Sequence, residues 1–146
     1  MSPLNVVPLS ETLSVAAQIA PADMPEIARA GFKSIVCNRP DGESPGQFGF
    51  SELAAAASQA GLTLAYLPVV SGRVTEEEGR AFAVLLNELP TPALAYCRSG
   101  MRSATLWALS QAGSQAWPEL VQRAAQAGFN LSGVAPPPQP EDTLIE

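Results

Sequence analysis

The side chains best suited to do chemistry lie together in one short segment near the middle of the chain. An apolar run, Ala93 to Tyr96, leads into Cys-Arg-Ser-Gly-Met-Arg-Ser at 97–103, and a largely apolar stretch follows. This order predicts a strand, a tight turn and the start of a helix. Because a helix N-terminus and neighbouring cations stabilise the thiolate form of a cysteine, we expect Cys97 to be a nucleophile.

The same loop has the features of an anion-binding site. Gly100 can adopt backbone angles that other residues avoid, which lets successive amide N–H groups turn inward. Arg102 adds a planar pair of donors, and Ser103 is placed either to cap the helix or to hydrogen-bond the thiolate. We expect Cys97 and Arg102 to be catalytic, and we expect the remaining loop residues to bind a small anionic substrate: Arg98, Ser99, Gly100, Met101 and Ser103.

The chain contains no histidine. This excludes Ser-His and Cys-His catalysis, and it removes the commonest zinc ligand. Dipoles and cations must therefore activate the nucleophile, and we expect neither a metal nor another cofactor.

A second polar loop, Asn-Arg-Pro-Asp-Gly-Glu at 38–43, has two interpretations. Its Pro-Asp-Gly sequence is typical of a plain connecting turn. Alternatively, Arg39 binds the substrate anion and Asp41 acts as a proton donor or an orienting group. Cys37, just before this loop, is interpreted as a small buried hydrophobe, or as a resolving thiol if the two cysteine-bearing strand ends are neighbours.

Alternating helix and strand signals surround these loops. Ala-Gly pairs, typical of helix C-termini, predict helices at about 22–30, 51–60, 103–112 and 118–127, with Ser51 capping the second. The sequence Thr-Glu-Glu-Glu at 75–78 predicts the start of another helix. Strands are expected at 33–38, 62–69 and 93–97, with an edge strand near 12–16. This alternation predicts an α/β fold with a parallel-centred sheet and helices on both faces.

Loops at the carboxyl ends of parallel strands meet in one crevice. In the predicted sheet these are loops 38–43, 70–73 and 97–102, which together bring four cations to one edge: Arg39, Arg73, Arg98 and Arg102. A locally basic crevice of this kind suits a small anion.

Length and composition limit the remaining possibilities. The chain has 146 residues, with 8 Lys and Arg against 14 Asp and Glu, so its net charge is −6. One domain over residues 1–135 and a Pro-rich tail at 136–146 are expected. A net negative charge does not indicate binding to nucleic acid. No apolar run approaches the ~20 residues that cross a membrane. With two cysteines and no signal peptide, a cytoplasmic location is expected.

At these residues the chain resembles the phosphatase-like domain of beta-lactamase hydrolase-like proteins, a bacterial family also described as sulfur transferases. The resemblance rests on residues 31–36, 38–43, Gln47, 67–69 and 96–103, with Leu106 to Ala108 behind them. It implies a three-layer fold like that of the dual-specificity phosphatases. In some relatives the domain is fused to a metallo-beta-lactamase-like persulfide dioxygenase.

Two departures from tyrosine-phosphatase-like enzymes bear on the reaction. Four residues separate Cys97 from Arg102 instead of five, and the region 68–73, where an acidic residue would stand, contains none. The short loop is similar to the active loop of rhodaneses, so sulfur transfer through a Cys97 persulfide is the favoured interpretation. The alternative is a phosphatase in which Cys97 forms a phosphocysteine, Arg102 binds the phosphoryl oxygens and Asp41 supplies the proton. A second alternative is a non-catalytic anion-binding module.

Overall fold

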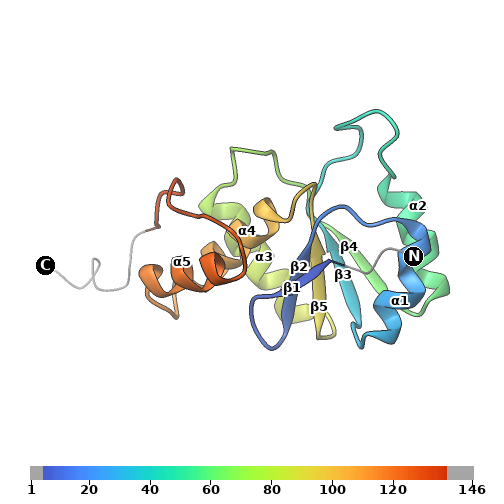
Figure 1. Cartoon of the computed structure of the whole chain (residues 1–146), viewed down its shortest axis with the longest axis horizontal. Helices are drawn as coiled ribbons and strands as arrows, with labels where there is room; N and C mark the ends of the chain where they lie inside the picture. The colour runs from blue at the N-terminus through green and yellow to red at the C-terminus, as the bar shows by residue number, and fades with distance from the viewer. Residues whose placement is uncertain (1–4, 138–146) are drawn as a thin grey trace, which may run out of the picture.

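The computed structural model describes residues 5–137. Within this range five strands form one sheet in the order β1-β2-β5-β3-β4 (Figure 1). Their bounds are β1 Val6–Pro8, β2 Leu13–Ala16, β3 Ser34–Cys37, β4 Thr63–Tyr66 and β5 Ala93–Tyr96. β1 pairs antiparallel with β2, and the other neighbours are parallel. The predicted α/β fold with a parallel-centred sheet is confirmed.

Helices cover both faces of the sheet (Figure 1). They are η1 Pro21–Asp23, a short 3-10 turn, then α1 Met24–Arg29, α2 Phe50–Gln59, α3 Glu76–Glu88, α4 Met101–Gln111 and α5 Trp117–Gln126. One core cluster joins the sheet to α3, α4 and α5 through Phe82, Leu106 and Leu120. The other joins it to α1 and α2 through Ile27 and Leu53. β5 lies in the middle of the sheet, so all four of its residues are buried.

The helix boundaries agree with the sequence patterns at some ends and differ at others. At the start of α3, Thr75 Oγ1 accepts a hydrogen bond from the Glu78 amide and Glu78 Oε1 accepts one from the Thr75 amide, which is the predicted capping box. α2 begins at Phe50 after Gly49, so the predicted cap at Ser51 is wrong. α4 begins at Met101, two residues earlier than predicted, because the chain turns sharply at Gly100.

The parallel strands place the polar loops at one edge of the sheet. Ala16, Cys37 and Tyr96, the last residues of β2, β3 and β5, share one register. Backbone hydrogen bonds continue past the strand ends, from the Asn38 amide to the Tyr96 carbonyl and from the Val69 amide to the Asn38 carbonyl. The loops that follow β3, β4 and β5 therefore start side by side, as predicted.

The part of the chain that the structure places contains no helix long and apolar enough to cross a bilayer. Most of the expected tail, residues 138–146, lies outside the described residues. The predicted domain boundary at residue 135 stays a prediction.

Candidate active site

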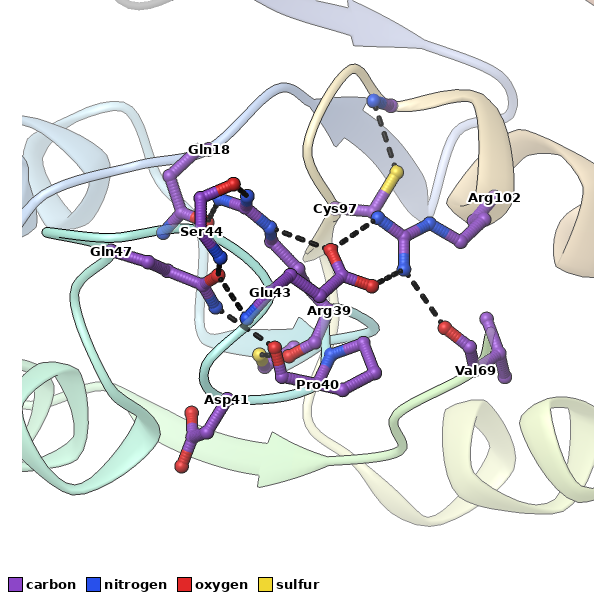
Figure 2. A network of polar contacts seen from close by, with 12 residues as sticks. Gln18, Arg39, Pro40, Asp41, Glu43, Ser44, Gln47, Val69, Cys97 and Arg102 are labelled. Carbon is purple, nitrogen blue, oxygen red and sulfur yellow. Dashed lines mark hydrogen bonds and ion pairs between the residues drawn. The ribbon is translucent and has the colours of Figure 1, made fainter. Parts of the chain in front are cut away.

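Cys97 directly follows β5, at the edge of the sheet where the parallel strands end. Its side chain is buried, and its Sγ accepts a hydrogen bond of 3.1 Å from the Gly100 amide (Figure 2). α4 begins one residue after Gly100, and the partial positive charge of a helix N-terminus favours an anion nearby. Both features favour negative charge at this position.

Both the backbone conformation and the surroundings of Gly100 favour glycine at this position. Its φ of +96° lies in the left-handed region, which side chains disfavour. A Cβ at this position would also lie 3.0 Å from the ring of Phe129, a residue that follows α5. The segment after α5 therefore packs directly on the Cys97 loop.

Arg102 lies in the first turn of α4 with only 6% of its surface exposed. Its Nη1 and Nη2 donate to the two carboxylate oxygens of Glu43 at 2.7 and 2.9 Å, and Nη1 also donates to the Val69 carbonyl at 2.9 Å (Figure 2). The hydrogen bonds to Glu43 raise the pKa of Arg102, and the nearby Cys97 sulfur raises it further. Within residues 5–137, Nε makes no hydrogen bond to nitrogen or oxygen, so the Nε side of the guanidinium is available to a ligand beside Cys97.

Glu43 is a residue of the candidate site that the sequence patterns did not single out. Its Oε1 accepts a 2.8 Å hydrogen bond from Arg39 Nε in addition to the bonds from Arg102. These contacts, those from Arg102 foremost, lower the pKa of Glu43 to about 2. The signal available in the sequence was a carboxylate in a polar loop that is predicted to face an arginine-bearing loop.

Arg39 does not occupy the place expected for a substrate ligand. It is buried, and its Nε, Nη1 and Nη2 donate to Glu43, Gln18 and Ser44 respectively. All three nitrogens thus have protein partners, which does not favour anion binding by Arg39, and that role stays a prediction. Arg39 instead holds the loop that carries Glu43.

Asp41 points away from Cys97 and Arg102 (Figure 2). Its Oδ1 accepts a 2.9 Å hydrogen bond from the Phe50 amide at the start of α2. Its own amide donates to the Tyr66 hydroxyl. Asp41 is therefore a helix-capping side chain in this structure, and its role as a proton donor stays a prediction.

Ser103 also has a partner that differs from both predictions. Its hydroxyl donates to Asn38 Oδ1 at 2.8 Å, and Asn38 Nδ2 donates to the Leu67 carbonyl at 2.9 Å. Ser103 therefore neither caps α4 nor bonds the thiolate. It ties the start of α4 to the end of β3, two elements that carry the site.

The remaining residues of the predicted anion site lie at its rim. Arg98 and Arg73 are exposed, and neither forms an ion pair within residues 5–137. Ser99 Oγ accepts a hydrogen bond from the Met101 amide at 3.3 Å, which tightens the turn. Ser99, Met101 and Arg102 also border a cavity of about 530 Å³.

Cys37 is packed in the core cluster on the α1 and α2 side of the sheet. Its Sγ donates to the Arg39 carbonyl at 3.3 Å, and burial raises the pKa of the thiol. This environment fits the buried hydrophobe and gives no support to a resolving thiol, although the strand ends are neighbours. Among the described residues, no group of three His, Cys, Asp or Glu side chains could hold a metal ion.

Residues 5–114 match the family model of the beta-lactamase hydrolase-like protein, phosphatase-like domain. The beta-lactamase hydrolase-like protein of Agrobacterium fabrum is 39% identical over 109 residues, which are 75% of this chain and 25% of that protein. The protein of the same name from Xylella fastidiosa Temecula1 is 35% identical over 108 residues, 74% of this chain and 25% of that protein. The chain thus spans about a quarter of the length of these curated relatives.

A crystal structure of a candidate phosphatase from Neisseria meningitidis Z2491 has 35% identity and a TM-score of 0.79, covering 87% of this chain and 91% of that chain. Kinase associated phosphatase has 16% identity and a TM-score of 0.68, with coverage of 87% and 85%, and so shares the fold. These likenesses confirm the dual-specificity-phosphatase-like fold. They favour the phosphatase alternative, and none of them supports sulfur transfer.

Proposed function

Since the chain belongs to the family of phosphatase-like domains of beta-lactamase hydrolase-like proteins, we propose that it hydrolyses phosphomonoesters with Cys97 as the nucleophile. One observation carries the proposal. Arg102 is fixed by Glu43 on one edge of its guanidinium, and the guanidinium also interacts with the Cys97 sulfur. A planar pair of donors beside a thiolate suits a phosphoryl group, whose charge spreads over three equatorial oxygens.

The reaction proceeds in two steps. The Cys97 thiolate attacks phosphorus, so that an S–P bond forms and the P–O bond to the leaving group breaks. The leaving oxygen takes a proton from water, because Asp41 is committed to capping α2. Water then attacks the phosphocysteine, the S–P bond breaks, and the thiolate and inorganic phosphate are released.

Preorganised donors lower the barrier to the first step. The Gly100 amide stabilises the thiolate before attack, and the positive charge of Arg102 stabilises the negative charge on the phosphoryl oxygens. Donors of this kind are each worth about 10²–10³ in rate when they meet charge in the transition state. Because the thiol must stay reduced, a cytoplasmic location accords with this chemistry.

The short loop between Cys97 and Arg102 remains the argument for sulfur transfer. A persulfide sulfur is a single soft atom and needs a smaller ring of donors than a phosphoryl group. That argument rests on loop length alone, whereas the family and the related structures favour the phosphatase. We therefore take phosphomonoester hydrolysis as the function.

The test compares wild type, Cys97→Ser and Cys37→Ser, in which the second cysteine serves as the matched control. Each protein is incubated with an aryl phosphomonoester and, separately, with thiosulfate plus cyanide. We expect ester hydrolysis by wild type and Cys37→Ser, and none by Cys97→Ser.

Two outcomes would overturn the proposal. Turnover of thiosulfate without ester hydrolysis would make sulfur transfer the favoured function. If no substrate is turned over while phosphate binds equally to wild type and Cys97→Ser, the domain is an anion-binding module.

A further inference from the structure

A cavity of about 530 Å³ opens beside Arg102, on the side of the site formed by α3, α4 and residues 133–136. Cavities that bury small organic ligands usually measure roughly 300–1,000 Å³. This one is therefore large enough for the body of a small molecule whose anionic end lies at the Cys97 loop.

The lining of the cavity combines polar and apolar side chains. Ser99 and Arg102 supply polar groups where it borders the Cys97 loop, and Ser71 and Thr105 add hydroxyl groups. Its other walls include the apolar side chains of Val74, Leu109, Val134 and Pro136. A molecule with an anion at one end and an apolar body matches a lining that offers Arg102 together with apolar side chains, since burial of apolar surface is favourable and burial of unpaired charge is not.

Glu76 is the acidic residue in the cavity wall. It forms an ion pair with Arg80 at 3.0 Å, and both side chains are well exposed, so the pairing is weak. A carboxylate here opposes a second negative charge on the bound molecule. The cavity wall therefore disfavours ligands that carry a second negative charge, in addition to favouring an apolar body.

We propose that this cavity holds the leaving group of the substrate, which is a free small-molecule phosphomonoester of an uncharged, apolar alcohol; this rests on the proposed hydrolase function. The phosphoryl group lies at Cys97 and Arg102, and the alcohol part extends between Val74, Leu109 and Val134. A phosphorylated peptide is the competing class of substrate.

The first experiment uses phosphomonoesters of equal leaving-group acidity that differ in an alkyl chain or in an added carboxylate. Each buried methylene is worth about 0.8 kcal/mol, so kcat/KM is expected to rise about fourfold per methylene until the cavity is filled. The carboxylated ester is expected to be the poorest substrate in wild type. Glu76→Gln should restore much of its kcat/KM, whereas the neighbouring exposed Glu77→Gln should not.

The second experiment fills the cavity. Gly133 lies in the wall, and a Cβ built on it meets no atom within 4 Å, so a side chain introduced there starts in open space. Gly113 is equally open but is not part of the wall, which makes Gly113→Phe the matched control. We expect Gly133→Phe to lower kcat/KM about tenfold or more for the long-chain ester while the smallest ester changes little. Gly113→Phe should leave both unchanged.

Binding is measured separately from turnover. Calorimetry on Cys97→Ser should give tighter binding of the long-chain ester than of the smallest one, with the difference reduced in Cys97→Ser combined with Gly133→Phe. If wild type hydrolyses no ester but this binding preference persists, the hydrolase function fails and the cavity assignment holds. If esters are hydrolysed with equal kcat/KM regardless of chain, or a phosphopeptide is preferred over all of them, the cavity assignment fails alone.

Discussion

Glu43 illustrates how a single carboxylate can prepare an anion-binding site without blocking it. Its carboxylate accepts hydrogen bonds from Nη1 and Nη2 of Arg102 and from Nε of Arg39. A guanidinium offers a second donor edge, through Nε, and that side remains for the substrate. We therefore expect Glu43 to be a positioning residue that acts through Arg102.

The change Glu43→Gln tests this role. Glutamine keeps the shape but loses the charge and one acceptor, so Arg102 is held less firmly. Because small displacements of a catalytic group cost about 100-fold in rate, we expect kcat/KM for an aryl phosphomonoester to fall by about that factor. The affinity for vanadate, measured by inhibition, should fall with it.

Glu119→Gln, an exposed change on α5, is the control and should behave as wild type. If Glu43 instead competes with the substrate for Arg102, the variant would bind vanadate more tightly and hydrolyse the ester faster. That result would contradict the positioning role.

At the scale of elements, the contact between α3 and α4 decides where the Cys97 loop lies. Gly79 of α3 faces Leu109 of α4 so closely that a Cβ on Gly79 would lie 2.5 Å from Leu109 Cβ. α4 begins directly after the loop, and its first turn carries Arg102. The packing of α3 on α4 therefore fixes the helix that presents the arginine.

Gly79→Ala should destabilise the fold, although alanine is the better helix former. The gain in helix propensity is about 1 kcal/mol, whereas overpacking a tight contact costs about 1–3 kcal/mol, and a 2.5 Å approach belongs at the upper end. We expect a net loss of about 1–2 kcal/mol in the free energy of unfolding, measured by urea denaturation. Gly113→Ala, where no atom lies within 4 Å, should not lose stability, and equal behaviour of the two variants would refute the argument.

The elements were predictable where their signals are local. The Thr75 capping box and the Ala-Gly helix ends depend only on nearby residues, and the order of strands and helices followed from them. β1 was missed because it has three residues and ends in Pro8, too short for a periodic pattern. The placement of Cys97 at a strand end needed no more than the apolar run before it.

The side-chain partners were not predictable, because they depend on how loops far apart in sequence fold against one another. Asp41 and Glu43 are two residues apart in the same loop, yet one caps α2 and the other binds Arg102. Ser103 finds Asn38, 65 residues away. Composition and spacing locate such residues near the site but do not orient their side chains.

Over the whole molecule, half of the eight cationic side chains lie at the end of the sheet that carries the site. The net charge is −6, yet the carboxyl edge of the sheet carries Arg39, Arg73, Arg98 and Arg102. Glu43 neutralises part of the charge on two of them, and the other two form no ion pair in the described range. Arg73 and Arg98 are exposed, so their positive charges attract small anions to this end of the sheet.

The Glu43 network also makes the stability of the fold depend on pH. In the folded protein the pKa of Glu43 is about 2, below its ordinary value of 4.5, chiefly because Arg102 donates hydrogen bonds to the carboxylate. The unfolded chain therefore takes up a proton at higher pH than the folded protein does. The stabilisation is fully present above about pH 4.5 and is lost as the pH falls from there toward 2.

Urea unfolding of wild type and Glu43→Gln between pH 6 and pH 2 measures this contribution. At pH 6 the variant should be the less stable protein, because it lacks the charge-assisted hydrogen bonds to Arg102 and Arg39. As the pH falls below 4.5, the difference should shrink, since wild type loses the same interactions on protonation. Glu119→Gln provides the comparison for removing an exposed carboxylate. A difference between wild type and Glu43→Gln that stays constant from pH 6 to pH 2 would mean that the ion pairs with the two arginines do not stabilise the fold.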